Sequence, residues 1–193
     1  MNSEFDADVI ERAPPAKLDA NAYAKTKTLS FISRSSSLNG AQNIFMPQGA
    51  CVIMPGVVLR ADMAKITLGK HCFVGRKVVL RPASGVFAWG VGFLPLTVGD
   101  FVTFGDECVV RAASIGSCVV VGIGCVLGER CIVRDCVQIL DGAVIPPDTV
   151  LPPYTCWAGN PARLVKSLPE SVSRTFEWKA EILYQQLTGE GTK

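Results

Sequence analysis

The stretch IGSCVVVGIGCVLGERCIVRDCVQIL, Ile115 to Leu140, carries an aliphatic residue at every sixth position. The series runs on and comprises Ile115, Val121, Leu127, Val133, Ile139, Ile145 and Leu151, followed by Trp157. A helix turns about 100° per residue, so a six-residue step would spread these side chains over three directions. In an extended chain an even step keeps them on one face. The repeat therefore excludes a helix and predicts short strands.

The residues between the repeat positions predict where the chain turns. A small or apolar residue stands two places before each aliphatic and provides a second inward side chain: Val119, Cys125, Cys131, Val137, Ala143, Thr149 and Thr155. Glycine, proline or a charged residue often follows the aliphatic, as at Gly116, Gly122 and Gly128, and interrupts the alternation. Three such hexads would form one coil, of about 18 residues, of a parallel β-helix.

The hexad also appears earlier in the chain. Units begin at Leu68, Val74, Val98 and Phe104, with a unit one residue short at Val110, and Ile53 and Leu59 fit the same register. We therefore predict an all-β solenoid of hexapeptide repeats over residues 28–166, with roughly six or seven coils that each rest on their neighbours. Periodicity alone leaves the hand of the coil open.

The cysteines fit the interior of such a coil. The chain has eight cysteines but no CxxC pair, and a free cysteine packs as a small hydrophobic residue. Counting through the repeat places Cys72, Cys108 and Cys125 in one inward column that Ala143 continues, and Cys131 on the next face. We predict reduced thiols with a packing role and no bound metal or cofactor.

Three segments depart from the repeat. Residues 1–27, rich in Ala, Asp and Pro, predict an extended or disordered arm. The segment PASGVFAWGVGFLP, residues 82–95, predicts an inserted loop. Residues 167–188 predict a C-terminal helix that lies along one flank of the solenoid. Its expected signals are a capping box of Ser167 and Glu170, an end at Gly189, and the helically spaced Val172, Phe176, Lys179, Leu183 and Leu187.

Aromatic side chains on the inserted loop are candidates for contact with a partner protein, because they bury large areas at small entropic cost. We predict this role for Phe87, Trp89 and Phe93, with Arg81 beside them as an anchor for an acidic motif. The alternative is that the aromatic rings fold back over the coil.

Composition narrows the class of protein further. Nineteen basic against 17 acidic side chains give a net charge of +2, which offers no field that would attract nucleic acid. No apolar run approaches the roughly 20 residues that span a bilayer, and the first 25 residues lack a signal-peptide core. We expect a soluble intracellular protein.

Two enzyme classes share this architecture: acyltransferases with a histidine base, and enzymes similar to gamma-class carbonic anhydrase, which bind zinc through three histidines shared between subunits. The chain has one histidine, His71, in the hexad LGKHCF, where its side chain should point outward near a corner. A lone general base needs an orienting carboxylate and a cleft, and a three-histidine zinc site is not assembled from one position. We therefore predict no catalytic residues. The alternative is a homotrimeric acyltransferase or carbonic-anhydrase-like enzyme.

Longer segments resemble a known family. LRADMAKITLG, with Arg60 and Asp62 as a predicted ion pair, looks like the Arg-x-Asp segment of carbonic-anhydrase-like β-helices. Together with the aromatic segment before LPLTVGD and the ending QILDGAVIPPDTVLPP, it resembles dynactin subunit 5, the family of smaller pointed-end subunits of dynactin, over about residues 29–168. The longer N-terminal arm and the residues after Pro169 depart from the family's pattern, so the resemblance implies no contacts for these two ends.

The resemblance implies a left-handed parallel β-helix in the gamma-carbonic-anhydrase-like superfamily and a non-enzymatic role. It implies a structural and adaptor-docking subunit of the dynactin pointed-end complex, which supports dynein-driven cargo transport on microtubules. The implied partners are the related β-helical dynactin subunit 6, the actin-related protein, dynactin subunit 4 and dynein cargo adaptors. The implied location is the cytoplasm and cytoskeleton, at microtubules and centrosomes.

Overall fold

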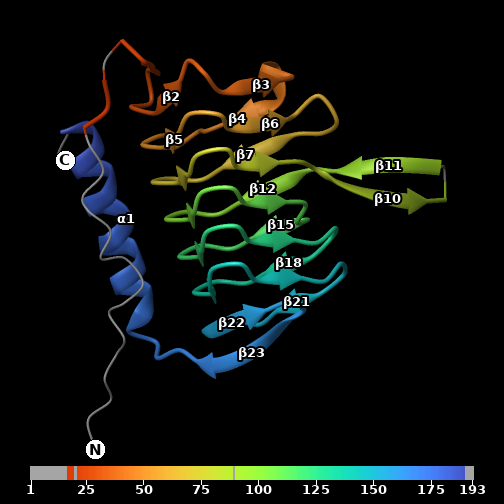
Figure 1. Cartoon of the computed structure of the whole chain (residues 1–193). Coiled ribbons are helices and arrows are strands. Elements are labelled where there is room, and N and C mark those ends of the chain that lie inside the picture. The colour runs from red at the N-terminus through yellow and green to blue at the C-terminus, as the bar shows by residue number, and fades with distance from the viewer. Residues whose placement is uncertain (1–16, 20, 89, 190–193) are drawn as a thin grey trace, which may run out of the picture.

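The chain forms a parallel β-solenoid of about six turns with one C-terminal helix (Figure 1). The computed structural model describes residues 17–19, 21–88 and 90–189. The predicted fold class, a β-solenoid of hexapeptide repeats with a terminal helix, is confirmed.

Three sheets form the walls of the solenoid, and from β2 to β22, apart from the separate pair β10 and β11, successive strands belong to successive walls. Sheet A contains β1 (Tyr23–Lys25), β2 (Phe31–Ser33), β5 (Val52–Ile53), β8 (Phe73–Val74), β13 (Thr103–Phe104), β16 (Val120–Val121), β19 (Gln138–Ile139), β22 (Thr155–Gly159) and β23 (Ala162–Ser167). Sheet B contains β3 (Ser37–Asn39), β6 (Val58–Arg60), β9 (Val79–Leu80), β14 (Val109–Val110), β17 (Val126–Leu127) and β20 (Val144–Ile145). Sheet C contains β4 (Ile44–Phe45), β7 (Ile66–Leu68), β12 (Leu96–Val98), β15 (Ser114–Ile115), β18 (Ile132–Val133) and β21 (Val150–Leu151), and a short 3-10 helix, Ala41–Asn43, precedes β4.

The hexad aliphatics fill the interior. Ile115, Val121, Leu127, Val133, Ile139, Ile145 and Leu151 are each at most 2% exposed and belong to one core cluster. Each stacks on its counterpart one coil away, as Leu127 does on Ile145 in the parallel pair of β17 and β20. Each fully buried aliphatic side chain contributes about 1.5–3 kcal/mol, so these seven side chains together outweigh the weak strand propensity of two-residue strands.

The glycines after the aliphatics mark close approaches between coils. A Cβ atom at Gly116 or Gly122 would lie closer than 3.0 Å to the carboxylate and backbone of an aspartate in the next coil, Asp135 or Asp141. These aspartates accept hydrogen bonds from the backbone N–H of Ser117 (2.8 Å) and Ile123 (2.7 Å). Glycine therefore makes room for a side chain that binds two coils together.

The corner between sheets C and A is built from residues in the left-handed region. Leu29, Ala50, His71, Phe101, Cys118, Cys136 and Tyr154 all have φ between 51° and 58° and occupy this corner, one in each coil. Left-handed backbone is unfavourable for residues with a Cβ atom, and it persists here because hydrogen bonds along the neighbouring coils hold each turn. The column that results faces outward, beneath the C-terminal helix.

The cysteine columns differ from the prediction. Cys108, Cys125 and Ala143 do share the inner side of sheet B, but Cys72 lies on sheet A, where it precedes Val74 and stacks between Cys51 and Val102. Val74 pairs with Phe104, so this coil is much longer than 18 residues, and a count carried through the insertion ends on the wrong wall. Cys131 lies on sheet C.

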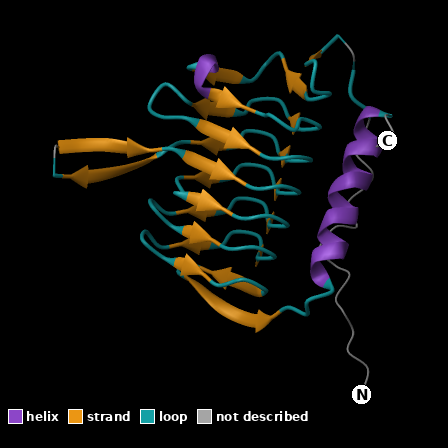
Figure 2. Cartoon of the chain, turned by 180° about the vertical axis from the view of Figure 1, so that it is seen from behind, coloured by secondary structure: helices purple, strands orange, loops and turns teal. Residues whose placement is uncertain are grey.

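The predicted loop at 82–95 is a β-hairpin. Strands β10 (Ala83–Phe87) and β11 (Gly90–Leu94) pair antiparallel and project from the corner between sheets B and C, on the side away from the helix (Figure 2). The prediction of a loop is wrong because Ala83, Ser84 and Gly85 face Leu94, Phe93 and Gly92 in a regular ladder.

The predicted arm, residues 1–27, lies mostly outside the described residues. Its described part is extended and joins the solenoid, because β1 pairs antiparallel with β2 and Tyr23 is only 9% exposed. Tyr23 and Leu18 pack in a cluster with Tyr184 and Leu187 of the C-terminal helix. This end of the chain therefore covers the first coils.

The C-terminal helix, α1 (Val172–Thr188), begins later than predicted. Ser167 belongs to β23, which pairs with β22, so the capping box of Ser167 and Glu170 is wrong; Ser171 is the N-cap and makes no side-chain cap bond. The helix ends at Gly189 (φ 71°), as predicted. Its buried residues are Val172, Phe176, Ala180, Tyr184 and Leu187, so Lys179 and Leu183 do not belong to the fully buried stripe.

Candidate protein-interaction surfaces

The hairpin presents two different sides. Val86 and Val91 are cross-strand partners on one side, 86% and 76% exposed, and Phe93 lies on the same side at 39%. Phe87 lies on the opposite side, where its ring covers Gly85 and Gly92. Strand alternation therefore separates two of the predicted contact residues.

Trp89 lies outside the described residues. Sequence reasoning missed Val86 and Val91 as exposed residues, although the alternation of glycine with larger side chains in GVGF is a signal for a two-sided strand. The exposed apolar side of the hairpin is thus Val86, Val91 and Phe93.

Charged side chains fix the base of the hairpin. The hydroxyl of Ser84 donates a hydrogen bond to Glu129 (2.6 Å), and Arg130 donates one to the carbonyl oxygen of Ser84 (2.8 Å). Arg130 also makes two bonds of 2.6 Å to Asp148 in the next coil. Arg81, the fourth predicted site residue, directly follows β9 beside this network, and its Nε is buried with no hydrogen-bond partner among the described residues.

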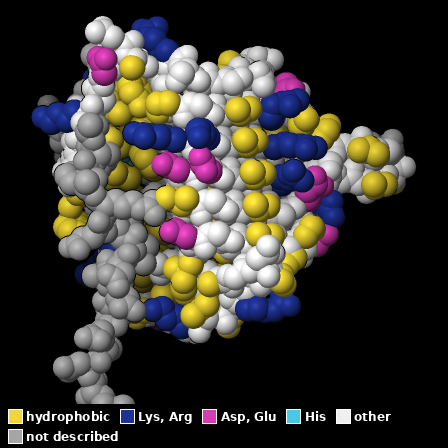
Figure 3. Space-filling view, viewed as in Figure 1, with side chains coloured by type: hydrophobic (Ala, Val, Ile, Leu, Met, Phe, Trp, Pro, Cys, Tyr) yellow, Lys and Arg dark blue, Asp and Glu magenta, His cyan; other side chains and the backbone are white. Residues whose placement is uncertain are grey.

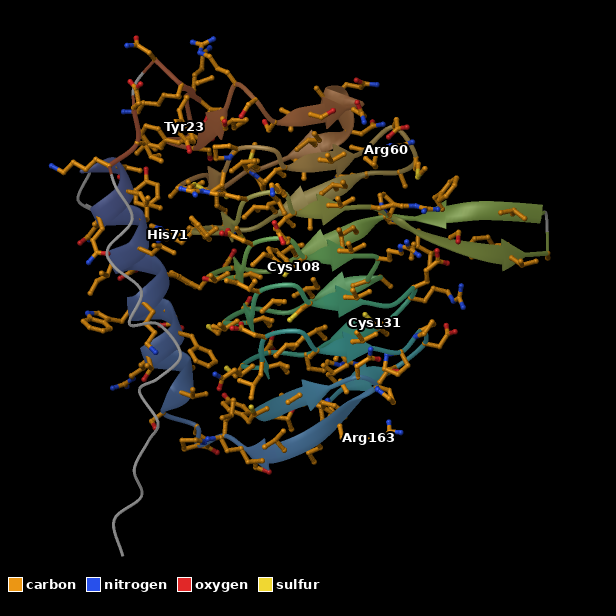
Figure 4. The ribbon with its side chains drawn as sticks, viewed as in Figure 1. Tyr23, Arg60, His71, Cys108, Cys131 and Arg163 are labelled. Atoms are coloured by element: carbon orange, nitrogen blue, oxygen red, sulfur yellow. The ribbon has the colours of Figure 1, made fainter. Side chains whose placement is uncertain are left out.

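The predicted ion pair of Arg60 and Asp62 is present. Nε and Nη2 of Arg60 donate to the two carboxylate oxygens of Asp62, each at 2.9 Å. The hydrogen bonds from Arg60 lower the pKa of the Asp62 carboxyl group. Figure 4 shows Arg60 on the hairpin side of the solenoid, far from α1.

His71 lies under α1 (Figure 4) and is 2% exposed. Its ring stacks on Phe101 with 5.4 Å between centroids and meets the edge of Tyr184 at 5.3 Å, and neither ring nitrogen has a hydrogen-bond partner among the described residues. Burial lowers the pKa of His71, and the positive charge of Lys70 lowers it further. The side chain points out of the coil as predicted, but the helix covers it, so it does not face a cleft.

All eight cysteines are free thiols and buried. Burial raises the pKa of Cys118 and of Cys131 to about 12. Within the described ranges, no group of three or more His, Cys, Asp or Glu side chains is arranged to hold a metal ion. The one histidine among those residues is enclosed by aromatic rings, so the zinc site of carbonic-anhydrase-like enzymes has no fitting donors here.

The three-walled coil, its glycine corners and its inward aliphatic columns define the class of hexapeptide-repeat β-solenoid proteins. No α-helix in the described part of the chain is long and apolar enough to cross a membrane. The chain belongs to the dynactin subunit 5 family, whose model matches residues 17–189.

The similar curated proteins include a dynactin subunit and a carbonic anhydrase. Dynactin subunit 5 of Dictyostelium discoideum is 36% identical over 103 residues, which cover 53% of this chain and 52% of that protein. Mitochondrial gamma carbonic anhydrase 2 of Arabidopsis thaliana is 26% identical over 140 residues, 72% of this chain and 49% of that protein. The matched region thus spans about half the length of these curated relatives.

Solved structures share the fold at low identity. A hexapeptide transferase family protein from Anaplasma phagocytophilum superposes with a TM-score of 0.58 at 20% identity, over 77% of this chain and 89% of that one. The N-acyltransferase AntD from Bacillus cereus, as the S84T mutant, gives a TM-score of 0.65 at 13% identity, over 86% and 98%. At these identities the likeness concerns the fold alone.

Proposed function

We propose that this chain is a non-catalytic structural subunit of the dynactin pointed-end complex. The observation that carries the proposal is the family match over residues 17–189, which includes both the solenoid and α1. The buried position of His71 supports a non-enzymatic role, because a general base must reach its substrate. The proposed partners are the related β-helical dynactin subunit 6, the actin-related protein and dynactin subunit 4. The proposed place is the cytoplasmic cytoskeleton, at microtubules and centrosomes.

The proposal extends to the docking of dynein cargo adaptors through the hairpin. Val86, Val91 and Phe93 form its exposed apolar side, and Arg81 stands at its base. Phe87 supports the hairpin from the other side by covering Gly85 and Gly92. Trp89 completes the predicted contact set.

Affinity purification of the full chain, followed by mass spectrometry, tests the assembly role. Dynactin components should co-purify, and the purified protein should show neither carbonic anhydrase nor acyltransferase activity. A homotrimer with turnover that His71→Ala abolishes would instead establish the enzyme alternative.

A double substitution tests the hairpin. Val86→Ser with Phe93→Ser should reduce adaptor binding, whereas Val165→Ser, at an exposed valine of β23, should leave it unchanged.

A further inference from the structure

The outer side of sheet B differs from those of the other two walls. The cluster of Tyr23, Val52, Met54, Tyr184 and Leu187 shows that α1 and β1 cover sheet A. The outer column of sheet C is mixed: Thr67, Thr97 and Ser114 carry hydroxyl groups in its middle, and apolar residues stand at its two ends, Phe45 at one and Ile132 and Val150 at the other. Sheet B is therefore the wall whose outer column is apolar without interruption over five successive strands.

A column of valines runs along sheet B. Its members are in direct parallel register, one in each of five successive strands, and each is half-buried with its side chain outward: Val58, Val79, Val109, Val126 and Val144. Figure 3 shows apolar side chains in a column along the solenoid, with Lys and Arg side chains beside it. We name this column the valine ladder.

Three arginines form a second column beside the valine ladder. Arg60, Arg81 and Arg111 each stand two residues after a ladder valine, so the three residues occupy equivalent positions in neighbouring coils. Arg60 is paired with Asp62, whereas Arg111 has only Glu129 at 4.0 Å. No ion pair between described residues includes Arg81, and the carboxylate of Glu129 already accepts the hydroxyl of Ser84. The middle of the column thus holds positive charge without matching acids.

The packing of α1 on sheet A shows that a helix can lie along a wall of this solenoid. On sheet A, α1 lies along the solenoid and packs Val172 and Phe176 against Val120 and Cys156, one helical turn after another. The valine ladder covers five rungs, a span of about 19 Å at the usual spacing between strands. An α-helix covers that span with roughly 13 residues, or three to four turns.

We infer that the valine ladder and its arginine column form a docking site for an amphipathic helix of a partner protein, with carboxylates that face Arg81 and Arg111. The apolar stripe of that helix covers the valines. Its acidic residues pair with Arg81, which has no ion pair among the described residues, and with Arg111, whose one contact with Glu129 is long. The partner comes from the dynactin assembly, so the inference rests on the function proposed above. The hairpin stands at the edge of this site, at the corner between sheets B and C.

Site-specific photo-crosslinking in the intact complex tests the site. The probe is p-benzoylphenylalanine in place of Val126 in the full chain, with the same residue in place of Ser114 on sheet C as the matched control. We expect crosslinks from position 126 to a segment with helical periodicity and acidic residues, and none to that segment from position 114. Absence of crosslinks from position 126, or crosslinks to the strands of a second β-solenoid, would overturn the inference.

Charge reversal provides the second readout. Arg81→Glu should lower recovery of the crosslinked segment about tenfold, while Arg81→Lys retains most of it. The matched control is Arg134→Glu, at an exposed residue that follows β18 of sheet C. Equal losses for Arg81→Glu and Arg134→Glu would contradict a specific role of Arg81. If the chain enters dynactin but position 126 crosslinks to nothing, the docking site alone is wrong; if it does not enter dynactin, both proposals fall.

Discussion

At the scale of single residues, the small space between neighbouring coils decides where the repeat needs glycine. Four of the glycines that follow an aliphatic leave room for an aspartate of the following coil: Gly69, Gly75, Gly116 and Gly122, the last for Asp141. That aspartate then accepts the backbone N–H of Ile123, so one pair of residues both permits and holds the close approach. Sequence reasoning identifies these glycines as corners, but the role of the aspartates needs the spatial register.

Gly122→Ala is expected to lower the free energy of unfolding by about 1–3 kcal/mol, because the added methyl group meets the carboxylate and backbone of Asp141. Urea denaturation followed by circular dichroism measures the change. Gly142→Ala is the control, since Gly142 has open space around it and carries only the strain of φ 67°. A larger loss at Gly142 than at Gly122 would show that close approach is not the main constraint.

His71 gives the fold a pH dependence. Burial holds its pKa below the ordinary value near 6.5, so above that pH the side chain is neutral in both the folded and the unfolded chain. As the pH falls below 6.5, the unfolded chain binds the proton more readily, and stability is lost until the folded pKa is passed. Glu181 and Asp100 oppose this effect and Lys70 reinforces it.

Thermal denaturation at pH 7.5 and pH 5.0 measures this contribution. The wild-type chain should lose more stability over that interval than His71→Phe, which keeps a ring against Phe101 and Tyr184 but does not titrate. Identical pH profiles for the two proteins would mean that other groups carry the dependence.

At the scale of elements, α1 acts as a strap along the corner between sheets C and A. Its first half packs with Cys118, Cys136 and Val120, and its second half encloses His71 and bonds the hydroxyl of Tyr184 to the carbonyl oxygen of Leu29 (2.7 Å). An isolated helix of this length is marginal in water, so contacts with the coils supply most of its stability.

Two aromatic residues on α1 allow the contribution of packing to stability to be distinguished from that of helix propensity. Phe176 is 5% exposed and Trp178 is 60% exposed. Phe176→Ala should lower the free energy of unfolding by about 3–5 kcal/mol, whereas Trp178→Ala should change it by about 0.5 kcal/mol or less. Guanidinium denaturation curves of the two variants measure this difference. A similar loss of unfolding free energy at both positions would contradict the finding that Phe176 faces the coils and Trp178 faces solvent.

The elements differ in how far the sequence predicts them. The hexads after Ile115 predict their strands and walls because the period is unbroken, and the pairing of Val121 with Ile139 confirms the register. The hairpin and the start of α1 are less predictable, because Gly-rich strands lack a strong apolar alternation and Ser167 is taken into β23 by pairing with Thr155. Cys72 is misplaced for the same reason, since the hairpin hides the true length of its coil.

At the scale of the molecule, the candidate surfaces arise from stacking rather than from any local motif. The valine ladder collects one residue from each of five coils, so no short segment of sequence contains it. Arg81 and the aromatic residues of the hairpin could be selected from composition, whereas Val86 and Val109 required the sheet register. The hidden position of His71 required the folded path of α1, which starts at the last coil and returns to the first (Figure 1).

The burial of all eight cysteines is a property of the whole solenoid. Native protein treated with iodoacetamide should gain no modified thiols within minutes, and denatured protein should gain eight, as intact mass spectrometry would show. Cys118 and Cys136 lie beneath α1 and should react first in Phe176→Ala, ahead of Cys108 and Cys125 in the interior. Rapid modification of Cys108 in the folded wild-type chain would contradict the closed interior.

Because α1 returns to the first coil, residues 18 and 187 lie next to each other. The backbone N–H of Leu18 donates to the carbonyl oxygen of Leu187 at 3.0 Å, so positions from opposite termini of a rod-like body are neighbours at one pole. A short peptide bridge at that point would turn the chain into a ring, and the ring could be cut at the exposed turn of Asp141 and Gly142 without removing a strand. Circular permutants of this kind would keep the stack of coils while giving the polypeptide new termini.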